Sequence, residues 1–321
     1  MNNLLLSLDE IGEHEVERCG GKAMNLGKLI RLGVKVPPGF CITSDALACV
    51  LDSNDLNRRI ADIAAKFDFD DFASVEAKTV EIRALIETAT IPAALQQDIV
   101  DHYEKLVGDG TKFVAVRSSV AVRDSTISSF PGMMDTYHYV LGADEVLVRV
   151  RECWASLWSS RATYLTHHKR VPHDKVVIAP VVQAMVNSDT AGVLFTANPV
   201  TKDRGEIMIE ANWGLGESVV SGKSMNDYFV LEKAGLDIKQ RKIAPKTLMV
   251  VMDTGKGSGR CELPVPADRA KLPTLSDDQL RELARAGKAI EQHYGFDVDI
   301  EWAYQKEQLY ILQARKIRDL D

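Results

Sequence analysis

The strongest constraint on the fold is an alternation of acidic and apolar residues near the end of the sequence. Asp297, Asp299 and Glu301 are each separated from the next by one apolar residue. A period of two is characteristic of a β-strand and places these three carboxylates on one strand face. The sequence therefore predicts a hairpin, with strands at Val298–Tyr304 and Gln308–Gln313 joined by a polar turn.

The second strand of this hairpin supplies Gln313 and Arg315, which again share one face. Oxygen ligands from Glu301 and Gln313 suit Mg²⁺, which commonly bridges protein carboxylates and nucleotide phosphates. Arg315 would neutralise phosphate charge beside the metal. A solvated hairpin face with a cross-strand ion pair fits the same pattern equally well, so the alternation by itself leaves both interpretations open.

Two further segments carry residues that suit phosphate. Gly20–Lys22 opens a predicted helix that runs to about Leu32, and the free N–H groups of a helix N-terminus favour anions. The segment is not a GxxxxGK[ST] loop, and two glycines before a helix more often form an ordinary turn. Arg117 is expected where a buried strand over 113–117 ends at a loop, a position that fits a phosphate ligand or a structural ion pair.

Loops supply two weaker signals. A loop is expected from Ser118 to about Asp135, and its small residues would let backbone amides approach phosphates. The alternative is an ordinary surface loop. A Gly-x-Gly turn at Gly214–Gly216 lacks the GxGxxG pattern and the βαβ context of a dinucleotide site, so it does not predict one.

Composition restricts the class of protein. With 321 residues and 45% hydrophobic content, the chain can bury a sizeable core in more than one lobe. A net charge of −7 argues against nucleic acid or an anionic membrane as partner, and no stretch is apolar enough to span a membrane. Five cysteines without a CxxC pair indicate reduced thiols in a cytoplasmic protein.

Hydrophobic periodicity predicts a mixed architecture. Helical spacing dominates from Thr43 to Leu106, and Asp144 and Ser276 are expected to cap later helices. Strands are expected over 176–186, 192–196, 206–211, 228–231 and 248–252. We therefore predict an α+β fold with an N-terminal lobe over 1–185 and a C-terminal lobe over 186–321 that carries the hairpin. Folds of this kind commonly bind ligands between lobes.

Six segments in a fixed order are more specific than any of them alone. They are Gly20–Gly27, Val36–Phe40, Val114–Ser119, Ala191–Thr196, Gly214–Glu217 and Glu301–Arg315. Together they resemble the ATP-grasp domain of the phosphoenolpyruvate-utilising dikinases, a group that includes phosphoenolpyruvate synthase, pyruvate phosphate dikinase and rifampicin phosphotransferase. The resemblance extends from about Leu8 to Ile317 and implies a two-lobed ATP-grasp fold with the nucleotide in the cleft between the lobes.

The resemblance also implies roles for individual residues. The implied ATP-binding residues are Lys22, Arg117, Gly132, Met133, Thr136, Gln183, Glu301, Gln313 and Arg315. Among these, the catalytic charge stabilisers are Lys22, Arg117 and Arg315. The implied ligands of Mg²⁺ are Glu301, Gln313 and Asp299. Gly132–Thr136 matches a loop that closes over the phosphates, and Gln183 lies on the strand beside the adenine.

Enzymes of this group carry the phosphoryl group on a histidine in a Gly-Gly-x-x-[Ser/Cys]-His motif, and no histidine of this sequence follows one. The resemblance therefore implies a histidine-bearing phosphocarrier or substrate subunit as partner. A standalone ATP-binding subunit of this kind occurs in phenylphosphate synthase, which this chain resembles in length. The expected function is transfer of the β-phosphoryl group of ATP to that histidine, with release of AMP and phosphate, for phenol phosphorylation.

Two alternatives remain open from the sequence. The chain could be a fragment of a phosphoenolpyruvate synthase or a rifampicin phosphotransferase, which predicts a contiguous histidine domain or substrate barrel. It could instead be a non-catalytic subunit that senses nucleotide, which predicts binding without release of AMP.

Overall fold

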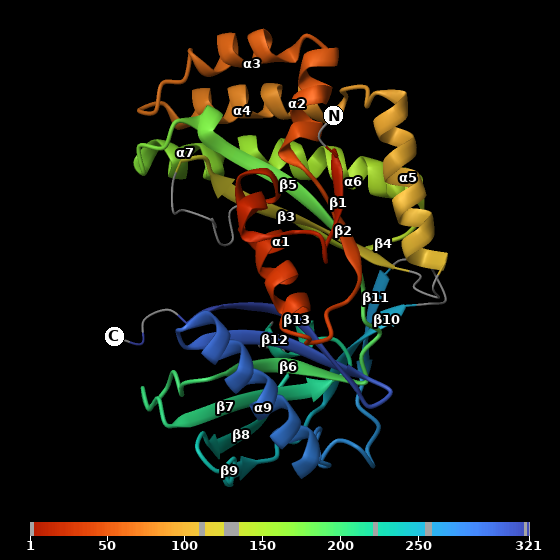
Figure 1. The fold of residues 1–321 in the computed structure, drawn as a ribbon, viewed down its shortest axis with the longest axis vertical. Helices are drawn as coiled ribbons and strands as arrows, with labels where there is room; N and C mark the ends of the chain where they lie inside the picture. The colour runs from red at the N-terminus through yellow and green to blue at the C-terminus, as the bar shows by residue number, and fades with distance from the viewer. Residues whose placement is uncertain are drawn as a thin grey trace. The chain divides into compact units, whose positions relative to one another are not determined.

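A computed structural model of the protein describes residues 3–108, 113–124, 135–220, 224–253, 259–317 and 320. The chain divides into two compact units, each with its own antiparallel sheet (Figure 1). Unit 1 comprises Met1–Lys28 and Pro38–Met185, and unit 2 comprises Leu29–Pro37 and Val186–Asp321. Unit 2 thus includes a segment from early in the chain.

Helices dominate the first half of the chain, as the periodicity of Thr43–Leu106 predicts. Its elements are β1 (Leu5–Ser7), η1 (Glu13–Glu15), α1 (Val16–Arg31), β2 (Gly39–Ile42), α2 (Ser44–Ser53), α3 (Leu56–Ala64), α4 (Phe72–Glu87), α5 (Ala93–Gly108), β3 (Val114–Val122), β4 (Thr136–Val140), α6 (Ala143–Ala155), η2 (Ser156–Trp158), α7 (Ser160–His168), η3 (His173–Lys175) and β5 (Val176–Ala184).

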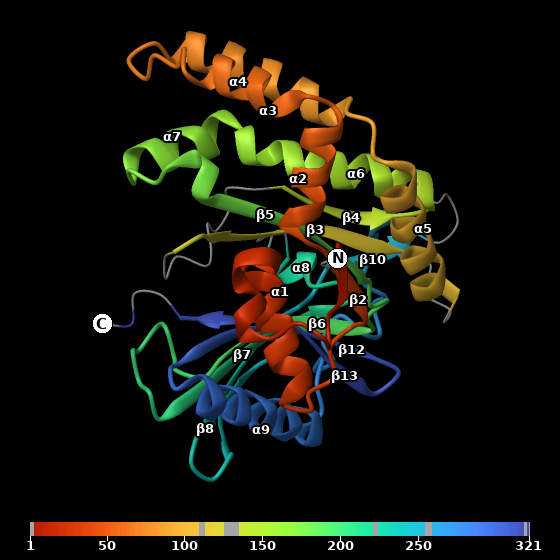
Figure 2. The ribbon, with the colours of Figure 1, turned by 45° about the horizontal axis from the view of Figure 1, so that its top comes forward.

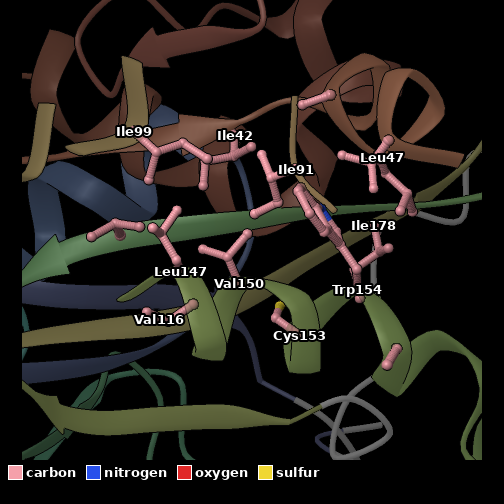
Figure 3. Packing of buried hydrophobic residues seen from close by; sticks show 14 of the residues in the cluster. Ile42, Leu47, Ile91, Ile99, Val116, Leu147, Val150, Cys153, Trp154 and Ile178 are labelled. Carbon is pink, nitrogen blue, oxygen red and sulfur yellow. The ribbon is translucent and has the colours of Figure 1, made fainter. Parts of the chain in front are cut away.

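The sheet of unit 1 has the strand order β1-β2-β5-β3-β4. Helix α6 contacts β3 and β5 on one side and α4 on the other, so it forms the middle layer (Figure 2). Its apolar stripe includes Val150 and Trp154, both fully buried, and packs with Val116 and Ile178 of the sheet (Figure 3). Burial of each side chain of this size contributes about 1.5–3 kcal/mol to the stability of the fold. The packing of α6 therefore determines that this face of the sheet is buried in the core.

Two expectations for unit 1 need correction. Strand β3 does not end at Arg117, because Ser118–Val122 continues it and pairs with β5 along its whole length. The N-cap of α6 is Gly142, so Asp144 does not cap the helix but lies in its first turn, where the helix dipole still favours a carboxylate.

The second half of the chain is rich in strands. Its elements are β6 (Thr190–Phe195), β7 (Glu206–Trp213), α8 (Glu217–Val220), β8 (Asp227–Glu232), β9 (Ile238–Lys242), β10 (Leu248–Asp253), β11 (Gly259–Pro264), α9 (Asp277–Tyr294), β12 (Val298–Gln305) and β13 (Gln308–Lys316). The capping box predicted at Ser276 is present and begins α9.

The sheet of unit 2 has the order β13-β12-β6-β7-β8-β9. Helix α9 lies against β6 and β12 (Figure 1), so that Gly287 of the helix approaches the side chain of Leu194. Trp302 and Tyr304 of β12 are fully buried, and the Tyr304 hydroxyl donates to Glu282 of α9 over 2.6 Å. Even-numbered positions of β12 therefore face α9, and odd-numbered positions face the opposite side of the sheet.

The early segment of unit 2, Leu29–Pro37, contacts the edge strand β13 of the sheet. The N–H of Ile311 in β13 donates to the carbonyl oxygen of Lys35 over 2.8 Å, and the Lys35 ammonium lies 4.9 Å from the ring centroid of Tyr310. Among the helices of the described ranges, none is both long and apolar enough to cross a membrane.

Candidate functional site

Gly20 interrupts α1 and makes a new helix start in front of Lys22. Its backbone has φ 74° and ψ 170°, a conformation available essentially only to glycine. A Cβ there would lie 2.4 Å from the backbone carbon of Ser119 and 2.5 Å from the nitrogen of Val120. The first glycine of the pair noted in the sequence, Gly20, is therefore required by close approach to β3, and Lys22 occupies the first turn after the kink.

A hydrogen bond fixes this turn to β3. The N–H of Ala23 donates to Oγ of Ser119 over 3.0 Å, in a buried position. Burial raises the pKa of the Cys153 thiol to about 12, and the nearby charge of Lys22 opposes that rise. The ammonium of Lys22 thus acts on the interior of unit 1 and is not a distant surface charge.

Arg117, Thr136 and Gln183 come together on neighbouring strands of unit 1. Arg117 is directly paired with Thr136 of β4 and with Val181 of β5, two residues before Gln183. Nη1 of Arg117 donates to Oε1 of Gln183 over 2.9 Å, and Gln183 is buried. Their positions in register place all three side chains on one face of the sheet.

The same face carries the anchor of the Lys22 turn. Ser119 lies two residues after Arg117 on β3, so both side chains point to the same side. Unit 1 therefore gathers Lys22, Arg117, Thr136 and Gln183 on the sheet face opposite α6. The predicted ligands Gly132 and Met133 lie outside the described residues. Sequence reasoning missed Ser119, although the period of two from Arg117 was the signal that could have found it.

In unit 2 the hairpin brings its four predicted residues together. Asp299 is directly paired with Arg315, and Glu301 with Gln313, across β12 and β13. These positions lie on the sheet face opposite α9. Nε of Arg315 donates to Oδ2 of Asp299 over 2.7 Å. The cross-strand ion pair that the alternation allowed is therefore present, next to a carboxylate and an amide that it does not involve.

Asp299 is unusual for a carboxylate because it is 9% exposed. Burial raises its pKa, and the charge and hydrogen bond of Arg315 oppose this shift while Glu301 adds to it. Its Oδ1 atom is buried and accepts no hydrogen bond in the structure. A buried carboxylate oxygen without a donor is costly, and a cation would satisfy it.

The donor set fits Mg²⁺. Asp299, Glu301 and Gln313 offer hard oxygen atoms on one sheet face, and Mg²⁺ usually takes one or two carboxylates together with substrate phosphates and water. Within the described ranges, no group of three or more histidine, cysteine, aspartate or glutamate residues is arranged to hold an ion. Asp299, Glu301 and Gln313 would leave the remaining positions of an octahedral Mg²⁺ ion to water or to another ligand.

The Gly-x-Gly turn at Gly214–Gly216 serves the architecture of unit 2. Gly214 has φ 77°, and a Cβ there would lie 2.1 Å from the carbonyl oxygen of Val250 in β10. The N–H of Leu215 donates to the same oxygen over 2.7 Å, and Glu217 forms an ion pair with Arg260 of β11. The turn therefore ties β7 to the β10–β11 hairpin.

Comparison with known families matches residues 16–321 to the pyruvate phosphate dikinase AMP/ATP-binding domain. The phosphoenolpyruvate synthase of Pyrococcus furiosus is 38% identical in an alignment 353 residues long, and this alignment covers 97% of this chain and 43% of that protein. A probable phosphoenolpyruvate synthase of Methanocaldococcus jannaschii is 40% identical, covering 98% of this chain and 26% of that protein.

A transferase of a different name is similar to the same extent. The prodigiosin synthesizing transferase PigC of Serratia marcescens is 40% identical over 304 residues, covering 94% of this chain and 32% of that protein. This chain spans less than half the length of each of these three relatives.

Proposed function

Because this chain belongs to the family of the pyruvate phosphate dikinase AMP/ATP-binding domain, we propose that it binds ATP for an AMP-forming phosphotransferase of the dikinase type. In this proposal the two units are the lobes of an ATP-grasp fold, and one nucleotide is bound by residues of both. The acceptor histidine comes from another domain or subunit. The names of the relatives support an ATP-dependent enzyme of this kind.

The observation that carries the proposal is the hairpin of unit 2. Asp299, Glu301, Gln313 and Arg315 lie on one sheet face, and the buried Oδ1 of Asp299 has no donor. A purely structural ion pair needs only Asp299 and Arg315. The adjacent Glu301–Gln313 pair supplies the oxygen ligands that a metal–nucleotide complex requires.

The chain's own residues would position and neutralise the triphosphate. Lys22, in a helix start, and Arg117, oriented by Gln183, would hold phosphate oxygens from unit 1. Arg315 would do the same from unit 2. Glu301 and Gln313, with Asp299 beside them, would hold Mg²⁺, which supplies further charge neutralisation when it is bound. Stabilisation of charge by such groups is the main protein contribution to phosphoryl transfer.

The proposed reaction transfers a pyrophosphoryl group from ATP to the partner histidine. A nitrogen of the partner histidine forms a bond to the β-phosphorus of ATP, and the bond from that phosphorus to the oxygen bridging to the α-phosphate breaks, which releases AMP. Water then cleaves the terminal phosphate from the pyrophosphorylated histidine. The remaining phosphohistidine donates its phosphoryl group to the final acceptor.

The test mixes this chain with ATP, Mg²⁺ and the histidine-bearing domain encoded in the same or the neighbouring reading frame, and measures AMP. We expect Arg117→Met and Glu301→Gln to lower the rate by about 10²–10³-fold, the usual effect of removing one charge-stabilising group. Arg123→Met, an exposed arginine just past β3, is the matched control. Unchanged rates in the first two variants would refute the assignment.

A second measurement tests the need for a histidine in trans. Rapid formation of AMP by the isolated chain would overturn that part of the proposal. Nucleotide binding without any AMP, even with the partner present, would instead favour a nucleotide-sensing subunit.

The molecule that finally accepts the phosphoryl group is pyruvate or phenol in this proposal. The relatives named phosphoenolpyruvate synthase favour pyruvate, and phenol is the acceptor that the sequence resemblance implies. The complete system should therefore be supplied with labelled ATP and either acceptor. Formation of phosphoenolpyruvate or of phenylphosphate decides between them.

A further inference from the structure

The connection between β6 and β7, residues 196–205, is a loop of unit 2 that is held by side-chain hydrogen bonds. Asn198 is 1% exposed and holds it from inside. Its Oδ1 accepts the N–H groups of Val200 over 3.0 Å and Thr201 over 3.3 Å, and its Nδ2 donates to Glu206 over 2.8 Å. The buried Asn198 side chain therefore holds both the backbone of the loop and the start of β7 through three part-buried hydrogen bonds.

An apolar side chain is presented at the tip of this rigid loop. Val200 is 76% exposed, more than any other large hydrophobic residue in the described ranges. Single exposed apolar residues are common on protein surfaces. The combination with a pre-organised backbone is different, because a rigid apolar anchor loses little entropy when a partner covers it.

The loop leaves the sheet at the end that carries the phosphate-binding hairpin residues. Phe195, the last residue of β6, is directly paired with Asp299. The N–H of Thr196 donates to the carbonyl oxygen of Val298 over 3.0 Å, and the N–H of Val298 donates to Oγ1 of Thr196 over 2.8 Å. The loop is therefore built onto the start of β12, one residue before Asp299.

A charged contact fixes the other side of the loop to the same strand end. Nε of Arg204 lies 3.4 Å from Oδ2 of Asp297, which immediately precedes β12. Lys202 is also exposed. The loop thus offers an apolar tip followed by basic side chains, directly beside the strand that holds Asp299.

We propose that the β6–β7 loop is the docking surface for the histidine-bearing domain, with Val200 as its apolar anchor. This inference rests on the proposed function. The occupant is identified by two observations: the relatives are more than twice as long as this chain, and the loop adjoins the end of the sheet where Arg315 would hold phosphate. A domain that delivers a histidine there meets this loop. Its complementary surface is an apolar socket for Val200.

The test measures AMP formation as a function of the concentration of the histidine-bearing domain. We expect Val200→Asp to raise the KM for that domain at least tenfold and to leave kcat within about twofold, because docking is weakened and the chemistry is not. Val200→Ile should behave as the wild type. Val80→Asp, at an exposed valine of α4 that is 56% exposed, is the matched control.

Binding of MgATP to the isolated variants, measured by calorimetry, should be unchanged. If Val200→Asp lowers the melting temperature, Val200→Ser gives the same comparison without a charge. An unchanged KM in both variants overturns the docking assignment while the proposed function stands. A fall in kcat at constant KM also overturns it, because Val200 would then act on the chemistry. Absence of AMP with the wild-type pair overturns the proposed function and this inference together.

Discussion

Arg315 and Asp299 occupy directly paired positions of β13 and β12, and Nε of Arg315 donates to Oδ2 of Asp299 over 2.7 Å. The other carboxylate oxygen, Oδ1, is buried and accepts no hydrogen bond. Arg315 thus satisfies half of a buried carboxylate. Burial still raises the pKa of Asp299, so the arginine offsets the cost of desolvation only in part.

Replacing Arg315 with Met should raise the pKa of Asp299 further, because the charge and hydrogen bond that oppose the shift are removed. A carboxyl with a raised folded-state pKa binds its proton more tightly in the folded than in the unfolded chain. The free energy of unfolding therefore falls as pH rises from about 4, the unfolded value, through the folded pKa. Arg315→Met should widen this interval, so its deficit relative to the wild type should grow from pH 4 to pH 7.

The double variant Asp299→Asn with Arg315→Met is the control for this effect, since it has no carboxyl to titrate. Urea unfolding of the three proteins between pH 4 and pH 7 gives the comparison. A deficit of Arg315→Met that is constant across this range would contradict the role assigned to Asp299.

Gly20→Ala should destabilise the protein more than Gly33→Ala. Both glycines have positive φ, 74° and 82°, so an alanine at either is strained by about 1–3 kcal/mol. Only at Gly20 does the new Cβ also meet Ser119 and Val120, which would displace the turn whose Ala23 N–H donates to Oγ of Ser119. Thermal unfolding should show the larger loss at Gly20. Equal losses would mean that the contact with β3 relaxes freely.

His173 should make the protein less stable at mildly acidic pH. Burial lowers its pKa to about 4, and the unfolded chain binds the proton near pH 6.5. The unfolded state therefore holds more protons between these values, and the free energy of unfolding should fall by about 3 kcal/mol as pH drops from 6.5 to 4.

His173→Gln should remove that slope, and His14→Gln, at a side chain that is 79% exposed, should keep it. Chemical denaturation at several pH values measures both. The same slope in His173→Gln as in the wild type would show that another group is responsible.

Asp227 should be among the most sensitive positions of unit 2. It is fully buried, and it accepts hydrogen bonds from the Lys246 ammonium at 2.6 Å, the Ala244 N–H at 2.9 Å, and the N–H and hydroxyl of Thr274 at 2.8 and 2.9 Å. Asp227→Asn leaves the buried ammonium without its counter-charge and should cost about 3–5 kcal/mol. Asp62→Asn, at an exposed ion pair, should cost less than about 1 kcal/mol. Comparable losses in the two variants would contradict this account.

The features that depend on local spacing could be predicted from the sequence. The alternation around Asp299 identified the hairpin because strand period is a property of neighbouring residues, and the capping box at Ser276 is equally local. The predicted end of β3 at Arg117 was wrong, because pairing with β5 decides where the strand stops and the local sequence does not show that pairing. A role for Ser119 likewise depended on a helix nearly a hundred positions away in the chain.

Other features depend on contacts between residues far apart in the sequence, or on a partner. The meeting of Arg117 with Gln183 follows from strand order, which the sequence does not encode in any short window. The acceptor of the phosphoryl group is a property of a partner, so residues of this chain carry little information about it. The two-lobed ATP-grasp arrangement stays a prediction, which substitutions at Lys22 and Glu301 would test together.

The contact between Lys35 and β13 has consequences for the synthesis of the chain and for its division into recombinant pieces. The carbonyl of Lys35 can meet its partner Ile311 only after a further 276 residues have been synthesised, a delay of some tens of seconds at about 5–20 residues per second. Until then the edge position is open to mispairing. A recombinant piece starting at Val186 would lack residues 29–37, so it would expose β13 to other chains, whereas a permuted chain that carries 29–37 after residue 321 would not.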